Sequence, residues 1–83
     1  MTDQIKQVLA AHARLAIPAE TLTDDTDLYA AGLTSHASVN VMFALEDEFD
    51  IQFPEDMMRK ATFGSISAIR AAVELLTSDA KDQ

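Results

Sequence analysis

Residues 32–49 of the chain read GLTSHASVNVMFALEDEF. Apolar residues recur through it at helical spacing, which predicts a helix that starts at Thr34 or Ser35 and runs to about Phe49. A serine at such a start commonly caps the helix, because its hydroxyl accepts a backbone N–H of the first turn. The open question is whether Ser35 only caps this helix or also carries chemistry.

The apolar residues of this helix form two stripes. One is an ordinary core-facing set, made of Ser38, Val41, Met42, Leu45 and Phe49. The other comprises His36, Val39 and Phe43, at positions i, i+3 and i+7 and displaced to one side. A wide buried arc and a partner-facing surface explain this second stripe equally well, so both interpretations stay open.

Two further helices are expected to pack against this one. The first covers about residues 3–16, with Thr2 as its cap, and the pre-proline Ile17 and Pro18 end it. The last is capped by Thr62, and it has a buried stripe of Ile66, Ile69, Val73 and Leu76. Between them, FDIQFP (49–54) predicts an extended connector that docks its apolar residues on the core, and EDMMRK (55–60) predicts a helical turn or two.

The predicted fold is therefore all-α: a small up-and-down bundle of three main helices plus a short helix. A long loop joins the first two main helices, and turn formers without a sustained period fill it. We expect Leu22, Leu28, Tyr29 and Leu33 to pin this loop to the core. Gly32 should supply a backbone conformation that other residues resist.

The length of 83 residues indicates one domain over 1–83, with an ordered core at about 3–77 and a frayed tail at 78–83. The chain has no cysteine, which excludes thiol catalysis, thiolate metal sites and disulfides, and which fits a reducing cytoplasm. The start, MTDQIKQVLA, has the features of neither a secretory signal nor a membrane anchor. We expect a cytoplasmic protein that is a monomer on its own.

The net charge of −8 is unevenly distributed, because no lysine or arginine occurs from Leu15 to Met58. The same stretch holds ten acids: Glu20, Asp24, Asp25, Asp27, Glu46, Asp47, Glu48, Asp50, Glu55 and Asp56. Such a surface repels nucleic acid and anionic lipid, and it attracts basic patches on proteins. A merely solubilising surface is the alternative.

Several kinds of chemistry are disfavoured by residue spacing. Ser35 and His36 are adjacent, and consecutive side chains on a helix do not face each other, which argues against a Ser/His hydrolase. His12 is expected to border the core. A calcium loop that starts at Asp25 would need a glycine at the position of Ala30 and a glutamate at the position of His36. We expect no catalytic residue and no metal site.

The stretch DLYAAGLTSHASVNVMFALEDEFDIQFPEDMM (27–58) resembles the acyl and peptidyl carrier proteins. The matching features are a glycine just ahead of a helix-starting serine (Gly32 and Ser35), an acidic helix that ends in ALEDEF (44–49), the exit FDIQFP, and the opening TFGSI (62–66) of the last helix. Together they span roughly residues 25–70.

The resemblance implies that Ser35 is the attachment point of 4′-phosphopantetheine, which a phosphopantetheinyl transferase moves there from coenzyme A. It also implies a non-catalytic carrier, whose cargo is held as a thioester and whose acidic helix docks on partner enzymes. The residues that this implies for docking are Thr34, His36, Val39, Asn40, Phe43, Glu46 and Asp47. A helix N-terminus is physically suited to a phosphodiester, since its unpaired N–H groups and dipole favour an anion.

Thr34-Ser35-His36 departs from the Asp-Ser-Leu of many carriers, which indicates a specialised member. The chain looks most like small stand-alone bacterial carriers, whose cargo is a small amino acid such as glycine or alanine. Ligases similar to class II aminoacyl-tRNA synthetases load them, and a downstream acceptor enzyme receives the cargo. Two alternatives are a specialised acyl carrier for fatty-acid or polyketide-type synthesis, and an unmodified acidic helical adaptor in which Ser35 is only a cap.

Overall fold

The structure is a computed structural model that describes residues 2–13, 15–18 and 21–81. It has three α-helices, α1 (Thr2–His12), α2 (Ser35–Phe49) and α3 (Ile66–Lys81). Two short 3₁₀ helices, η2 (Glu55–Met57) and η3 (Lys60–Phe63), lie between α2 and α3. The described residues contain no β-strand, and the predicted all-α bundle is confirmed.

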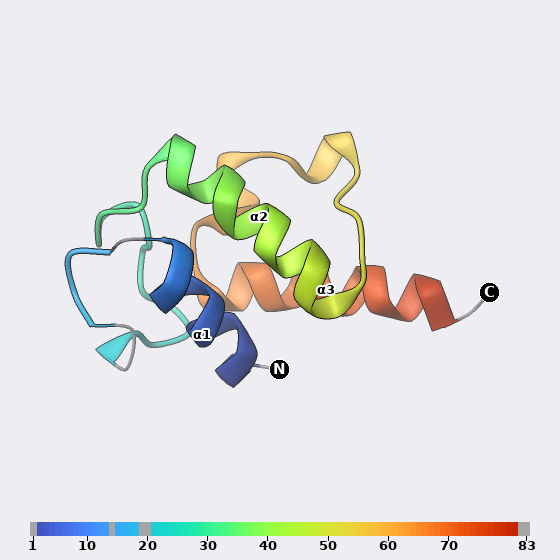
Figure 1. Cartoon of the computed structure of the whole chain (residues 1–83), viewed down its shortest axis with the longest axis horizontal. Helices are drawn as coiled ribbons and strands as arrows, with labels where there is room; N and C mark the ends of the chain where they lie inside the picture. The colour runs from blue at the N-terminus through green and yellow to red at the C-terminus, as the bar shows by residue number, and fades with distance from the viewer. Residues whose placement is uncertain (1, 14, 19–20, 82–83) are drawn as a thin grey trace.

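The helices are arranged around one core (Figure 1). α1 and α2 run in opposite directions, and a long loop that wraps around one end of the molecule joins them. α3 runs in the same general direction as α2, because the connector with η2 and η3 carries the chain back across the bundle. The return leg of the expected up-and-down arrangement is thus made by the connector, and not by a full helix.

All three helices contribute fully buried aliphatic side chains to this core, and the loop adds one. The largest of these side chains are Ile5, Leu9, Leu28, Val41, Leu45, Ile66, Ile69 and Val73. The expected loop pins are confirmed, since three of the four are buried and Tyr29 packs against the core half-buried. The connector docks Ile51 and Phe53 in the same core, as its alternating pattern predicts.

Hydrogen bonds to the start of α3 hold the long loop in place. The Leu28 N–H donates to the Gly64 carbonyl (2.8 Å), and the Ser67 N–H donates to the Asp24 carbonyl (3.0 Å). The Arg70 guanidinium adds a bond to the Asp24 carboxylate at 3.1 Å. The segment that leads into α2 is therefore positioned by residues about forty places later in the chain.

At the other end of the loop, the chain approaches α1 closely. The Ala16 N–H donates to the Ala31 carbonyl (2.9 Å), next to Gly32, which has a φ of 117°. Only glycine adopts such a backbone conformation readily. The Ala16 N–H serves this loop contact, and α1 ends at His12 rather than at about residue 16 as predicted.

Two of the predicted helix caps differ from the structure. Thr2 is the first residue of α1, where its hydroxyl accepts a hydrogen bond from Arg70 of α3 (2.9 Å). Thr62 lies inside η3, and the hydroxyl that accepts a first-turn N–H of α3, that of Ala68, belongs to Ser65 (3.1 Å). Both predictions placed a suitable hydroxyl near a helix start but missed the residue at which the helix begins.

The far end of α3 extends to Lys81. The frayed tail expected over 78–83 stays a prediction, and its last two residues lie outside the described residues. None of the described helices is both long enough and apolar enough to cross a membrane.

Candidate functional site

Thr34, and not Ser35, caps helix α2. Thr34 has an extended backbone (φ −103°, ψ 164°), and its hydroxyl accepts the Ala37 N–H at 3.0 Å. Ser35 is the first helical residue, and it is exposed. The interpretation of Ser35 as the cap of this helix is therefore wrong.

The Ser35 hydroxyl makes no hydrogen bond within the described part of the chain, although the Ser35 carbonyl accepts one from Ser38 (2.8 Å). The first intrahelical bond of α2 runs from the Ser38 N–H to the Thr34 carbonyl (2.9 Å). The N–H groups of Ser35 and His36 consequently have no intrahelical acceptor, as is usual in a first turn. A free hydroxyl thus lies beside two free backbone donors at the positive end of the helix dipole.

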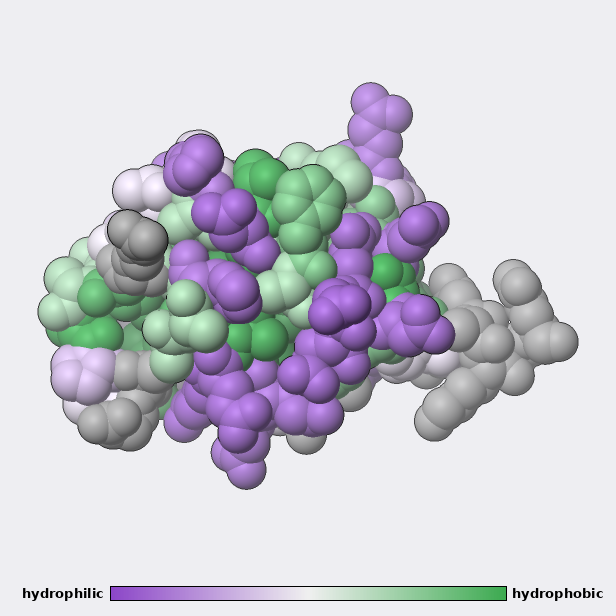
Figure 2. Space-filling model, viewed as in Figure 1, coloured by the Kyte–Doolittle hydropathy of each residue, from purple (hydrophilic) through white to green (hydrophobic). Residues whose placement is uncertain are grey.

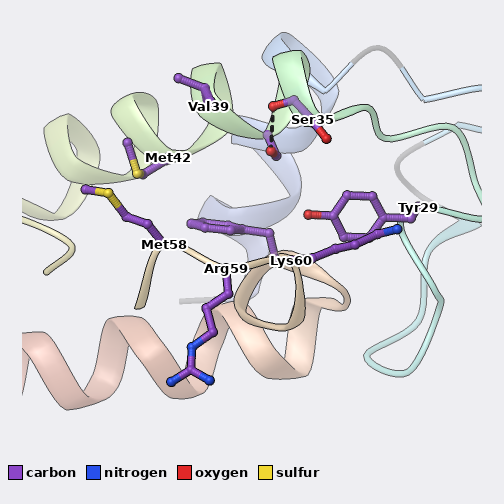
Figure 3. A pocket seen from close by; sticks show the side chains of 9 residues that line it. Tyr29, Ser35, Val39, Met42, Met58, Arg59 and Lys60 are labelled. Carbon is purple, nitrogen blue, oxygen red and sulfur yellow. Dashed lines mark hydrogen bonds between the residues drawn. The ribbon is translucent and has the colours of Figure 1, made fainter. Parts of the chain in front are cut away.

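A groove of about 290 Å³ opens beside Ser35, between α2 and the connector (Figure 3). Apolar side chains form most of its lining. The residues of the α2 wall are Ser35, Ser38, Val39 and Met42, and those of the facing side are Tyr29, Met58, Arg59, Lys60 and Phe63. The groove can therefore hold a slender, mostly apolar group that starts at Ser35.

Lys60 and Tyr29 lie together at one end of this groove (Figure 3). The Lys60 ammonium is 4.8 Å from the centre of the Tyr29 ring, a cation–π contact. Arg59 points away from the groove, and its Nε donates to the Asp56 carbonyl at 2.8 Å. Tyr29, Met58 and Lys60 were not predicted from the sequence as site residues. The only sequence signal for Lys60 is that the run without basic residues ends at Arg59.

The second apolar stripe of α2 faces solvent. Val39 is 46% exposed, Phe43 is 58% exposed, and His36 is also exposed. Figure 2 shows an apolar area over the middle of α2 with hydrophilic side chains around it. The stripe of His36, Val39 and Phe43 is therefore an exposed surface and not part of a wide buried arc.

Two further docking candidates share a shallow hollow with Phe43. Asn40 and Asp47 are exposed on α2, and they line this hollow together with His12 of α1. Thr34, Ser35, His36, Val39, Asn40, Phe43 and Asp47 are therefore all on the accessible side of α2 or at its start.

Glu46 differs from the other docking candidates. It is half-buried, and its carboxylate accepts the Phe53 N–H at 2.8 Å. Its charge is thus engaged within the chain, whereas the neighbouring Asp47 is exposed.

The two histidines lie away from the Ser35 groove. His12 and His36 line a separate hollow with Gly32, Thr34 and Asn40, and Ser35 is not part of its lining. His12 is exposed at the end of α1 rather than at the border of the core, which corrects the sequence-based expectation. The geometry therefore offers Ser35 no imidazole base in its own groove.

These features fit a serine that carries a phosphodiester-linked group. The hydroxyl is accessible and makes no hydrogen bond with the residues that the structure describes, and the neighbouring N–H groups of Ser35 and His36 can meet phosphate oxygens. The adjoining groove offers apolar surface, with a hydroxyl on Tyr29 and an ammonium on Lys60. The protein is thus a small helical bundle with an accessible serine at the start of a helix.

Comparison with known proteins gives the same class. Residues 3–75 match the family described as the phosphopantetheine attachment site. An aminoacyl carrier protein of Agrobacterium fabrum is 43% identical over 76 residues, which cover 92% of each chain. This chain therefore belongs to the phosphopantetheine-binding carrier protein family, whose prosthetic group is 4′-phosphopantetheine.

Solved structures share the fold closely. One is a carrier protein of Agrobacterium tumefaciens in complex with an engineered glycine:[carrier protein] ligase of Bradyrhizobium japonicum and AMP. It has a TM-score of 0.87 and 43% identity over 89% of this chain and 99% of that one. A second, with a TM-score of 0.73 and 30% identity over 86% of this chain and 95% of that one, comes from a complex of the Bradyrhizobium ligase with a glycylated carrier protein.

Proposed function

We propose that Ser35 is the residue of this carrier protein to which 4′-phosphopantetheine is attached. The observation that carries the proposal is that Thr34 caps α2, so the exposed Ser35 hydroxyl is left free at the helix start. Once attached, the group would supply the thiol that a cysteine-free chain lacks, to hold cargo as a thioester. The first-turn N–H groups of Ser35 and His36 would bind the phosphate oxygens.

The cargo that we propose is a small amino acid, glycine or alanine, loaded by an amino acid:[carrier protein] ligase. Support comes from the 43% identity to an aminoacyl carrier protein and from the carrier proteins of similar fold that were solved with glycine ligases. In this proposal the chain is itself non-catalytic, and it is a substrate for the transferase, for the ligase and for a downstream acceptor enzyme. The expectations of a monomer and of a cytoplasmic location stay predictions.

The proposed docking surface for these enzymes is the exposed side of α2, with His36, Val39, Asn40 and Phe43 as contacts. Thr34 borders it at the helix start, and Asp47 is its charged member. An exposed aromatic beside carboxylates suits a partner that presents an apolar pocket and basic side chains. Glu46 was part of the set predicted from the sequence, but its contact with the Phe53 N–H supports a different role.

The test is the intact mass of the protein after incubation with coenzyme A and a phosphopantetheinyl transferase of broad specificity. We expect the wild type to gain one phosphopantetheine and Ser35→Ala to gain none. Folded wild-type protein that stays unmodified, while a control carrier is modified, would refute the proposal. Glycine, alanine and a fatty acid, each offered with its candidate ligase to the modified protein, would then separate an aminoacyl carrier from an acyl carrier.

The docking surface is tested in the same assay. Phe43→Ser and Asp47→Lys should slow the transfer without a change in thermal unfolding, because both side chains are exposed. Wild-type transfer should also weaken as salt rises, since exposed charges are screened. Rates equal to the wild type would remove these residues from the docking surface.

A further inference from the structure

Three backbone N–H groups at the start of the connector after α2 donate to one residue, Glu46. The Asp50 N–H and the Ile51 N–H both donate to the Glu46 backbone carbonyl, the latter at 3.1 Å. Two residues further on, the Phe53 N–H donates to the Glu46 carboxylate at 2.8 Å. The Phe53 bond is the one of the three that depends on the identity of the side chain at position 46.

Beyond Phe53, the next hydrogen bond from the connector to another part of the molecule is at Gly64, whose carbonyl accepts the Leu28 N–H. Within the described residues, the backbone bonds of 54–62 stay inside the segment, such as Met57 to Pro54, Met58 to Glu55 and Thr62 to Arg59, except at its end, where the Ala61 carbonyl accepts the Gly64 N–H (3.4 Å). Phe53 and Phe63 are 3% and 4% exposed, and their ring centres are 5.4 Å apart. The segment 54–62 is thus held between two anchored ends.

This held segment is also part of the groove beside Ser35. Met58 and Lys60 both line the groove: the half-exposed Met58 lies across it from Met42 of α2, and Lys60 extends toward Tyr29 (Figure 3). A shift of the Phe53 end would therefore move the groove wall relative to Ser35. The fixed wall on α2 would stay in place, because Met42 and its neighbours Val41 and Leu45 are buried.

We infer that Glu46 is a positioning residue that acts as a hydrogen-bond acceptor to hold the groove wall beside Ser35, and not as a docking charge. The inference rests on the proposed attachment at Ser35 for its functional meaning, but the hydrogen bond itself does not. Glu46 differs from the exposed Asp47 in that it is half-buried and its carboxylate is already bonded to an N–H. Such a carboxylate is less available to a basic partner.

Two variants separate the acceptor from the charge. Glu46→Gln removes the charge and keeps an oxygen at the same reach, whereas Glu46→Asp keeps the charge and withdraws the oxygen by one methylene group. If Glu46 acts as the acceptor, Glu46→Gln keeps the groove wall in place and Glu46→Asp displaces it. If Glu46 acts as a docking charge, Glu46→Asp keeps the rate of phosphopantetheine transfer and Glu46→Gln lowers it.

The first readout is amide hydrogen exchange by NMR on the unmodified protein. In Glu46→Asp we expect the Phe53 N–H to exchange about tenfold faster, as the loss of one hydrogen bond allows, and the Met58 and Lys60 amide resonances to shift. In Glu46→Gln these amides should stay close to the wild type. Both variants should fold, because Ile51 and Phe53 keep their apolar contacts.

The second readout is the initial rate of phosphopantetheine transfer, with Asp47→Asn as the matched loss of an exposed charge. We expect Glu46→Asp to slow transfer by at least about threefold through the displaced wall, and Glu46→Gln to match the wild type. Slow transfer in Glu46→Gln with normal transfer in Glu46→Asp would overturn the inference, as would unchanged Phe53 exchange in Glu46→Asp. If the wild type accepts no phosphopantetheine, the attachment proposal fails, whereas the exchange data still test the anchor.

Discussion

Helices α2 and α3 begin in the same way, but the residue after the cap differs. At α2 the Thr34 hydroxyl accepts the Ala37 N–H at 3.0 Å, and at α3 the Ser65 hydroxyl accepts the Ala68 N–H at 3.1 Å. The next residue of α3 is Ile66, which is completely buried. The next residue of α2 is the exposed Ser35.

The comparison shows which feature of a helix start indicates function here. One hydroxyl at the cap position satisfies an otherwise unpaired N–H, and it is explained by stability alone. A second hydroxyl immediately after the cap adds nothing to that bond, and at α3 an aliphatic core residue takes its place. The free hydroxyl of Ser35 is thus the one available for the attachment that we propose, and the capping hydroxyl beside it is structural.

The largest expected difference in stability between the two starts is at the residue after the cap. Ile66→Ala should lower the free energy of unfolding by about 2–5 kcal/mol, because it empties a fully buried site. Ser35→Ala should change it by less than about 0.5 kcal/mol, because Ser35 is exposed and its hydroxyl has no internal partner. Urea unfolding of both variants measures this. A comparable loss in the two would mean that Ser35 supports the fold.

A smaller difference in stability between the two helix starts is expected at the glycines that precede the caps. Gly32→Ala should cost about 1–3 kcal/mol, because φ is 117° and a Cβ would lie 3.1 Å from the Ala16 nitrogen. Gly64→Ala should be neutral or stabilising by up to about 1 kcal/mol, since its φ of −75° suits alanine and the new Cβ makes only ordinary contacts. Thermal unfolding compares the pair, and an equal loss would contradict the strain assigned to Gly32.

The smallest difference in stability between the two helix starts is expected at the caps themselves, where the two helices should respond alike. Thr34→Ala and Ser65→Ala should each lower the free energy of unfolding by about 1 kcal/mol, because each leaves one first-turn N–H without its acceptor. Thr34→Ser should restore most of the loss at α2. If Thr34→Ala left stability unchanged, another group, such as the Ser35 hydroxyl, would have to replace the cap.

The local pattern of the sequence predicted α2 and the packing of its neighbours well. The bounds of α2, the pins at Leu22, Leu28 and Leu33, and the docking of Ile51 and Phe53 all follow from residue periodicity and turn chemistry. The backbone of Gly32 was also predicted, since few other residues fit a turn of that kind.

The errors arose where tertiary contacts decide the structure. Thr62 was predicted as the cap of the last helix, but it lies inside η3, where its N–H donates to the Arg59 carbonyl; the capping hydroxyl belongs to Ser65, three residues later, and α3 begins at Ile66. The groove beside Ser35 could not be predicted, because Tyr29 and Lys60 meet only in the folded chain. The contact of the Glu46 carboxylate with the Phe53 N–H could not be predicted either, because it depends on how the connector turns.

The attachment of the long loop to α3 also bears on the order of events during protein synthesis. The loop that leads into Ser35 makes three hydrogen bonds with Gly64, Ser67 and Arg70, which the ribosome adds after the serine. A growing chain that has released only its first half lacks these three partners, and of the loop's anchors it retains the bond of the Ala16 N–H to the Ala31 carbonyl. The full set of contacts that positions Ser35 therefore forms only after residues 64–70 have been added.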